Sequence, residues 1–385
     1  MPRRLQSPQL GLALHVLAIS LFTRICLYLV GTASALGMLP LRPAIHPYAP
    51  PHSLGTTLVG PWTSWDASWY IRIAAQGYTY LPGKSPAFFP LFPLVIRLFA
   101  IGGHFAFTAW LLSFLFYLAA MVLLAFLVTS RFGTQTAIYT VWTLSSFPTT
   151  YVFQAAYTES LFLLLTSAAF LAVYRGKWGI AGLLGGLAAM TRSTGVGLLL
   201  PLLGLAADSR VRWRVLWLIL IPVGLGMVML IDTLSVGDPL AFTHAQQAWQ
   251  RHLQAPWLPL IQTFHLLGDI FPPWFHGHMP GARNPLSMLP VDAFILIITF
   301  LTLAICWRRI GLWWSLWGLV LVGFPLLEAS AISPLYSYSR YVLVAFPLAV
   351  GIATFPHYVR ILYFSLSWPA TLYFSALYTL HYWIS

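Results

Sequence analysis

Long apolar stretches recur along this chain and leave few folds open to it. The clearest cover residues 10–30, 105–128, 213–231, 291–306, 312–327 and 341–355. A helix needs about 20 mostly apolar residues to cross the hydrocarbon core of a bilayer. Only 7% of the residues are charged, whereas soluble domains carry about a quarter. We therefore predict an all-α, polytopic integral membrane protein.

The chain reads as one membrane domain over residues 1–385, because no polar stretch is long enough to fold by itself. Its first outer loop is predicted at about 32–85. The first apolar run follows two arginines, as a secretory signal would, but it is too long for a signal core and contains Arg24. We interpret it as a retained first helix. Cys26 and Cys306 both lie in apolar segments, which argues against a disulfide framework.

The net charge of +12 lies mostly at the ends of the apolar segments. Basic residues there set topology and meet anionic headgroups, so the expected partners are membrane lipids and not nucleic acid. The basic clusters assigned to the cytoplasm are 3–4, 175–177, 210–214, 308–309 and 360. Alternate crossings then place these segments outside: 32–85, the region of Glu159, the turn at Arg192, 232–289 and 328–340.

One conflict remains in this topology. Three apolar segments, 86–102, 105–129 and 134–153, separate the first outer loop from Glu159. Both ends of this region are assigned to the outer side, so an even number of crossings is required. We expect one of the three to be re-entrant or to lie along the interface.

Asp66 stands out because the chain has only eight acidic residues. It lies in WDASWYIRIA (65–74), which is typical of a short amphipathic helix at the outer membrane interface. Asp66 and Tyr70 share one face of that helix, and Trp65 and Trp69 share another. The carboxylate would then lie at the level of lipid headgroups. A helix N-cap aspartate in an interfacial anchor is the alternative.

Four more ionisable residues lie within predicted spans or at their outer ends, where charge is costly and marks functional candidates. Arg24 is inside the first span, Arg192 and Arg340 are at outer helix ends, and Glu159 opens the helix that follows it. Arginine binds phosphate as a bidentate donor, so these residues indicate a site for an anionic headgroup. The structural alternatives are arginines that snorkel to the interface and a first-turn acid favoured by the helix dipole.

A metal site has little support. His276-Gly277-His278, with Asp269 nearby, forms a single H-x-H without a second carboxylate pair. We predict no metal cofactor and leave a divalent ion as the alternative. His244 and His252 would roughly share a helix face, where loop packing is expected over sugar binding. No Walker loop, dinucleotide fingerprint or nucleophile elbow occurs in the sequence.

Four blocks, in order, resemble the PIG-V-like mannosyltransferases, a family that includes the second mannosyltransferase of GPI-anchor assembly and many bacterial relatives. The blocks are WD…Y…IA…GY (65–78) followed by AFFPLFPL (87–94), YTESLF (157–162), GLLGGLAAMTRS (182–193), and SRY…FPL (339–348). The resemblance implies a GT-C-type bundle of about 10–12 helices with an amphipathic interfacial helix in the first outer loop.

The resemblance also implies a function: transfer of a hexose, mannose in the family, from a polyprenyl-phosphate donor. The acceptor would be a lipid-linked or cell-envelope glycan or glycolipid, and the transfer would invert the configuration of the anomeric carbon. It maps the catalytic acid of the first outer loop onto Asp66, as general base. One base suffices for an inverting transfer, and arginines can stabilise the leaving phosphate in place of a metal. The further donor-site candidates are Arg192, Arg340, Glu159, Arg24, Tyr70 and Trp65.

Compact loops and the lack of an ER-retention tail favour a bacterial plasma membrane, with the site on the outer face, over the endoplasmic reticulum membrane. Two other functions remain open. A transporter or flippase for a lipid-linked sugar would use the same arginines, but the sequence shows no convincing inverted repeat. A non-catalytic relative is the third possibility.

Overall fold

The computed structural model of the chain describes residues 7–41, 43, 58–209, 212–275 and 284–384. Within these ranges the regular structure is helical, apart from one antiparallel bridge between Arg251 and Ser330. Twelve of the described α-helices are ten residues or longer. The prediction of an all-α fold is therefore confirmed. Part of the predicted first outer loop, residues 44–57, lies outside the described ranges.

Four helical stretches of the described chain are long and apolar enough to cross a membrane, and each contains a predicted span. The first two are Pro8–Ala35, in α1 (Ser7–Ala35), and α5 (Phe105–Phe132). The third, Trp213–Val236, consists of η6 (Trp213–Ile219) and α10 (Leu220–Val236). The fourth, Pro285–Ile310, consists of η8 (Pro285–Met288) and α13 (Leu289–Ile310). Large apolar side chains remain exposed along them, as on α1 at Leu14, Phe22 and Leu29. Lipid, not water, suits such surfaces, and the chain is an integral membrane protein.

The two remaining predicted spans differ from expectation. The stretch 312–327 forms α14 (Leu312–Leu327), whose 16 residues extend only about 24 Å. The stretch 341–355 is not one helix, and that prediction is wrong. It is divided between α15 (Tyr338–Leu343) and α16 (Phe346–Ala353), with a turn at Ala345. Proline favours the first turn of a helix and interrupts a helix interior, so Pro347 starts a new helix there.

Helix length distinguishes one of the three segments in the crossing conflict from the other two. Segment 86–102 contains only α4 (Leu91–Phe99), flanked by the short turns η2 (Ser85–Ala87) and η3 (Ile101–Gly103). Nine residues span about 14 Å, too little to cross a bilayer. Segment 105–129 forms the long α5, and segment 134–153 contains α6 (Thr134–Ser145) and η4 (Thr150–Phe153). Of the three segments, only 105–129 forms a helix long enough to cross, because α6 has 12 residues and extends about 18 Å.

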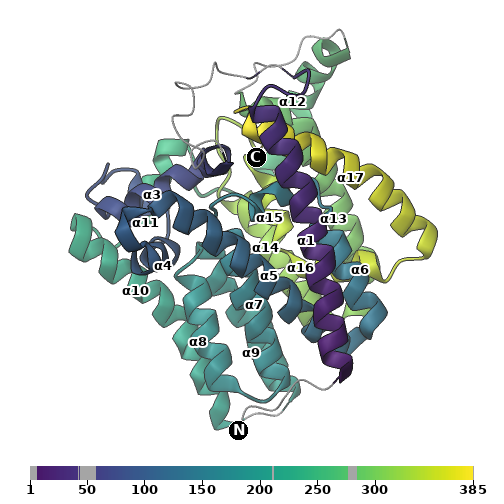
Figure 1. Cartoon of the computed structure of the whole chain (residues 1–385). Coiled ribbons are helices and arrows are strands. Elements are labelled where there is room, and N and C mark those ends of the chain that lie inside the picture. The colour runs from purple at the N-terminus through teal and green to yellow at the C-terminus, as the bar shows by residue number, and fades with distance from the viewer. Residues whose placement is uncertain (1–6, 42, 44–57, 210–211, 276–283, 385) are drawn as a thin grey trace.

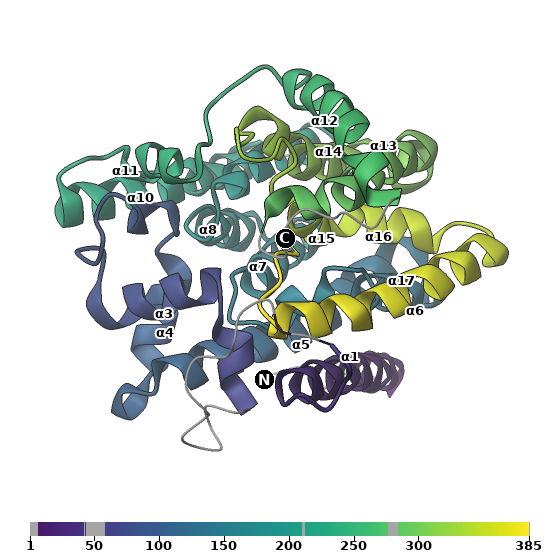
Figure 2. The ribbon, with the colours of Figure 1, turned by 90° about the horizontal axis from the view of Figure 1, so that it is seen from above.

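The helices are arranged around a central group (Figures 1 and 2). Seen from above, α3 (Asp66–Gln76) and α4 lie on one side, and α13, α14 and α17 (His357–Thr379) lie on another. Between them stand α7 (Glu159–Tyr174) and α15. The short helices α3 and α11 (Ala241–His244) lie at the same end of the molecule as α12 (Leu258–Phe275). This arrangement brings α3, α7 and α15 to a common centre.

Close packing of α8 (Trp178–Ala189) against α10 supports one side of that centre. A Cβ atom on Gly224 would overlap the backbone of Gly186, and one on Gly182 would overlap the carbonyl of Trp217. Small residues let membrane helices approach closely where lipid provides no hydrophobic driving force. Beyond α8 the chain turns through Arg192 into η5 (Ser193–Leu198) and α9 (Leu199–Asp208).

Candidate functional site

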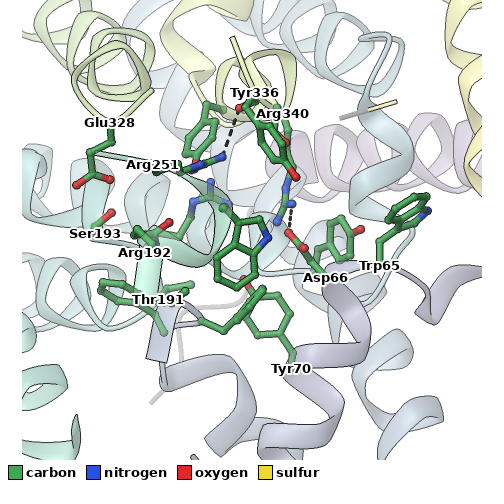
Figure 3. A pocket seen from close by; sticks show the side chains of 18 of the residues that line it. Trp65, Asp66, Tyr70, Thr191, Arg192, Ser193, Arg251, Glu328, Tyr336 and Arg340 are labelled. Carbon is green, nitrogen blue, oxygen red and sulfur yellow. Dashed lines mark hydrogen bonds and ion pairs between the residues drawn. The ribbon is translucent and has the colours of Figure 1, made fainter. Parts of the chain in front are cut away.

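A cleft of about 910 Å³, counted out to the solvent, opens between α3 and α15 (Figure 3). Its walls come from seven parts of the chain: residues 65–70 at the start of α3, residues 87–89, Tyr157, the turn 191–193, residues 246–251, the segment 328–341, and Trp383 near the C-terminus. Five of the seven predicted site residues line it: Trp65, Asp66, Tyr70, Arg192 and Arg340.

Asp66 is the first residue of α3, where an acidic side chain is favoured by the helix dipole. Its Oδ2 accepts a hydrogen bond from Nη1 of Arg340, and the two form an ion pair. The other carboxylate oxygen, Oδ1, accepts no hydrogen bond from the described part of the chain. The Asp66 side chain is 34% exposed, and that exposure is to the cleft it lines. One carboxylate oxygen is therefore fixed and the other is accessible.

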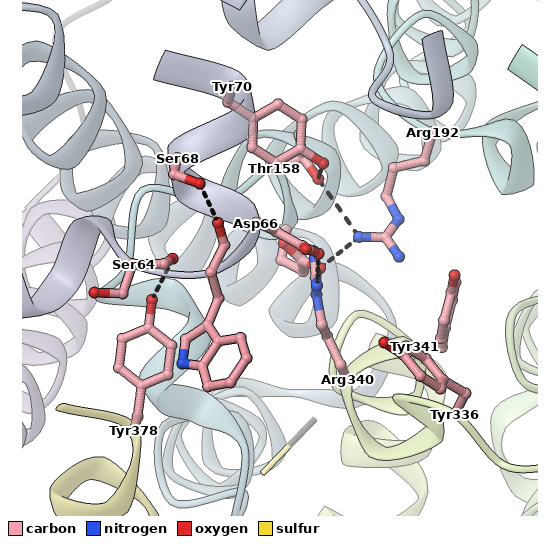
Figure 4. Close-up of polar contacts among 12 residues, drawn as sticks. Ser64, Asp66, Ser68, Tyr70, Thr158, Arg192, Tyr336, Arg340, Tyr341 and Tyr378 are labelled. Carbon is pink, nitrogen blue, oxygen red and sulfur yellow. Dashed lines mark hydrogen bonds and ion pairs between the residues drawn. The ribbon is translucent and has the colours of Figure 1, made fainter. Parts of the chain in front are cut away.

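Glu159 does not line the cleft, but it is fully buried and pairs with two arginines that do. Its Oε1 accepts from Nε of Arg340 and from Nη1 of Arg192, the latter at 2.5 Å (Figure 4). Arg192 also donates to Oγ1 of Thr158, at 3.4 Å. One carboxylate thus holds two guanidinium groups side by side. Because a buried charge is stable only when it is paired, these three side chains depend on one another.

The backbone that carries Arg340 is held from two directions. Oδ1 of Asp292, in the first turn of α13, accepts from the amide of Ser339 at 2.9 Å. Oγ1 of Thr149 donates to the Ser339 carbonyl at 3.1 Å. Ser337, just before α15, has a left-handed φ of 60°. Such backbone geometry persists only where surrounding contacts enforce it.

Electrostatics in the cleft keep two neighbours of Asp66 in a single protonation state. Burial tends to lower the pKa of Arg340, but Glu159 and Asp66 outweigh it and raise that pKa well above its usual value. Burial raises the pKa of Tyr70 to about 12, with Arg340 opposing. Tyr70 is therefore a neutral phenol at ordinary pH, within 3.5 Å of Thr158 Oγ1. Neither group is therefore suited to act as a base at ordinary pH.

Arg24 does not belong to this site, and its predicted phosphate-binding role is wrong. Its guanidinium donates to the carbonyls of Thr150, at 2.6 Å, and Ser145, at 3.2 Å, and to Oγ1 of Thr150. It also lies over the ring of Tyr117, 4.6 Å from the centroid. The residue is 1% exposed. Arg24 instead satisfies the Ser145 carbonyl at the end of α6 and the Thr150 carbonyl in η4, a role that depends on tertiary contacts.

The segment 232–289, which was predicted to be outside, contributes residues that the sequence did not single out. His244 and His252 were the candidates there, but neither lines the cleft. His244 is exposed and pairs with Asp238 at 2.7 Å. The cleft is lined instead by Gln246, Trp249 and Arg251 of the same segment. The only sequence signal was the combination of an arginine with neighbouring aromatic residues in a loop assigned to the outer side.

The predicted metal motif cannot be placed, because His276 and His278 lie outside the described residues. Among the residues that are described, no three side chains of His, Cys, Asp or Glu gather as a metal site would require.

Comparison with known proteins relates both the sequence and the fold to glycosyltransferases. Residues 14–200 match the family described as mannosyltransferase (PIG-V). No curated protein matches the sequence. The fold is similar to the crystal structure of ArnT from Cupriavidus metallidurans bound to undecaprenyl phosphate, with a TM-score of 0.50 and 16% sequence identity. The match covers 89% of this chain and 60% of the ArnT chain, so this chain spans less than two thirds of ArnT. Residues 14–200 therefore relate this chain to the mannosyltransferase (PIG-V) family, and its fold is that of a GT-C glycosyltransferase.

Proposed function

We propose that this protein transfers a hexose, mannose by its family, from a polyprenyl-phosphate donor to a lipid-linked or envelope glycan acceptor, with inversion. The site would face the outer side of a bacterial plasma membrane. The observation that carries the proposal is the state of Asp66, which has one oxygen held by Arg340 and the other accessible in the cleft. A carboxylate held in this way is suited to accept a proton from a positioned hydroxyl group.

The proposed reaction is a single displacement. The acceptor hydroxyl oxygen attacks the anomeric carbon of the donor sugar, and its proton passes to Oδ1 of Asp66. The bond between that carbon and the phosphate oxygen breaks, and polyprenyl phosphate leaves with the bonding electron pair. One displacement at the anomeric carbon inverts its configuration.

The charge that develops on the leaving phosphate needs stabilisation. Three arginines lie at the cleft, Arg192, Arg251 and Arg340. Since guanidinium groups can supply this stabilisation, the proposal assigns no step to a metal ion, and transfer is expected to persist in EDTA.

Aromatic side chains support a sugar as the transferred group. The cleft is lined by Trp65, Trp249 and Trp383, with Trp65 and Trp383 packed edge to face at 5.2 Å between ring centroids. Rigid aromatic walls offer apolar surface and fixed geometry at little entropic cost, which suits the apolar faces of a hexose ring.

The test compares wild type with Asp66→Asn in detergent, using radiolabelled polyprenyl-phosphate-mannose and a crude lipid extract as acceptor. We expect the substitution to lower transfer by about 10²–10⁴-fold, the range for loss of a general base. Asp269→Asn, an exposed acid on α12, is the matched control and should transfer at the wild-type rate. Thermal unfolding of each variant separates lost chemistry from lost folding.

Three outcomes would count against the proposal. Equal transfer by wild type and Asp66→Asn would remove Asp66 from the mechanism. Retained configuration at the anomeric carbon would exclude a single displacement. Translocation of carrier-linked sugar across vesicles, without transfer from any of several donors, would favour a flippase.

A further inference from the structure

We infer that Arg251, and not Arg192 or Arg340, is the residue that anchors the phosphate of the polyprenyl-phosphate ligand. This inference rests on the proposed function and deepens it. It follows from how the three cleft arginines are paired, from how Arg251 is held, and from where it enters the cleft.

Two of the three arginines are already neutralised. Arg340 pairs with both Asp66 and Glu159, and Arg192 pairs with Glu159. A phosphate that captured either guanidinium would leave the carboxylate of Glu159, fully buried, with fewer partners. Breaking a buried pair in this way is strongly unfavourable. Arg251 forms no ion pair in the described part of the chain, which contains all eight acidic residues.

The contacts of Arg251 leave its charge and most of its donors available. Its Nη1 donates to the hydroxyl of Tyr341 at 2.7 Å, and its Nη2 donates to the carbonyl of Tyr336 at 3.4 Å. The guanidinium also lies over the Tyr336 ring, 5.2 Å from the centroid. These acceptors are neutral. Since a guanidinium carries five N–H groups, about three remain for a phosphate.

The backbone of Arg251 is fixed, so the side chain is positioned before any ligand arrives. Residues 249–254 pair with 327–331: the amide of Ala331 donates to the Gln250 carbonyl at 3.0 Å, and the amide of Gln254 donates to the Leu327 carbonyl at 2.9 Å. Gln250 adopts a left-handed φ of 52° immediately before Arg251. A preorganised donor loses less entropy on binding than a mobile surface arginine.

Position within the cleft also distinguishes Arg251 from Arg340 as a phosphate ligand. In an inverting displacement the base and the leaving group lie on opposite sides of the anomeric carbon. Arg340 is bonded to Asp66 itself, and so lies on the side of the base. Arg251 enters the cleft from the side of Glu328, whereas Asp66 enters from α3 (Figure 3). A phosphate on Arg251 therefore leaves room for the sugar to lie between phosphate and base.

The test measures binding of undecaprenyl phosphate and of uncharged undecaprenol to purified protein in nanodiscs. Arg251→Gln should weaken undecaprenyl-phosphate binding by about tenfold or more, the value of one charge-assisted hydrogen bond, and abolish the preference for the phosphate. Arg251→Lys should bind with intermediate affinity, because it keeps the charge but loses the bidentate fork. The donor KM in sugar transfer should rise in the same order.

The matched control is Arg72→Gln. Arg72 is an exposed arginine of α3 that also lies over a tyrosine, Tyr80, at 5.2 Å, and it does not line the cleft. The Arg72→Gln variant loses the same charge as Arg251→Gln and should bind undecaprenyl phosphate as tightly as wild type. If Arg251→Gln unfolds, Arg251→Lys carries the test alone.

The outcomes distinguish this inference from the proposed function. The anchor would be overturned if Arg251→Gln bound undecaprenyl phosphate with wild-type affinity and transferred sugar normally. Where Arg251→Gln unfolds, the same result in Arg251→Lys would overturn it. Either result would leave the proposed glycosyltransferase function intact. Equal weakening by Arg72→Gln would show a general charge effect and would also overturn it. Failure of the wild-type protein to bind undecaprenyl phosphate at all would overturn both.

Discussion

Glu159 is the side chain on which the geometry of the cleft depends most. It is fully buried, its Oε1 is shared by Arg192 and Arg340, and its Oε2 accepts no hydrogen bond in the described part of the chain. Its position in the sequence suggests a first-turn acid that the helix dipole favours. The dipole accounts for only part of this environment. Its main role is to compensate two guanidinium groups, one of which positions Asp66.

Glu159→Gln is expected to lower the free energy of unfolding by about 3–5 kcal/mol, because two largely buried cations lose their counter-charge. Sugar transfer should be lost with it, since Arg340 would no longer be fixed beside Asp66. Denaturation in detergent measures the first effect. The control is Glu328→Gln, which changes the only other glutamate, one without an ion pair in the described chain. A control as unstable as Glu159→Gln would refute the pairing argument.

At the scale of elements, the contact of α8 with α10 controls the position of Arg192. The chain leaves α8 at Ala189 and reaches Arg192 within three residues. Backbone contact at Gly186 and Gly224 sets the distance between the two helices. A change in that distance would move the turn that carries Arg192, and with it one partner of Glu159.

Two glycines of α10 provide a matched pair of substitutions. Gly224→Ala places a methyl group against the backbone of Gly186 and should destabilise the protein by about 1–3 kcal/mol, as overpacking does. Gly226→Ala meets nothing within 4 Å. It should be neutral or stabilising by up to about 1 kcal/mol, through helix propensity. Thermal unfolding in one detergent compares them, and equal midpoints would contradict the close contact.

At the scale of the whole molecule, the charges are arranged about the membrane. The cluster 175–177 follows α7, whose other end carries Glu159, the partner of two cleft arginines. The cluster 308–309 ends α13, whose first turn carries Asp292, the acceptor for the amide of Ser339 beside Arg340. Basic residues concentrate in cytoplasmic segments, which would place the cleft outside. The proposed donor and acceptor both depend on that orientation.

Cysteine labelling tests the orientation, in a background without Cys26 and Cys306. Lys84→Cys, in an exposed turn after α3, should react with a membrane-impermeant maleimide in intact cells. Lys177→Cys, exposed before α8, should react only after permeabilisation. The two sites control for each other, because both are exposed lysines. The reverse pattern would place the cleft in the cytoplasm and would require a different donor supply.

Local patterns in the sequence were sufficient to predict the membrane class, four spans and the amphipathic helix of Asp66. Each depends on hydrophobicity and periodicity within about 20 residues. Bilayer thickness and the helix repeat determine these local patterns, so no tertiary contact is needed to recognise them. The same information predicted that Asp66, Arg192 and Arg340 lie on one side of the membrane. It failed at 341–355, where composition alone suggested a span and Pro347 divided it.

The partners of each charge were decided only by the tertiary structure. Arg24 and Arg340 look alike in sequence, as arginines in or beside apolar segments. Arg24 meets backbone carbonyls 121 and 126 residues away, whereas Arg340 meets carboxylates 181 and 274 residues away. Arg251 belongs to no motif in the sequence, and the pairing of 249–254 with 327–331 brings it to the cleft. Whether a buried cation is structural or available to a ligand depends on which groups satisfy it, and packing between distant segments chooses those groups.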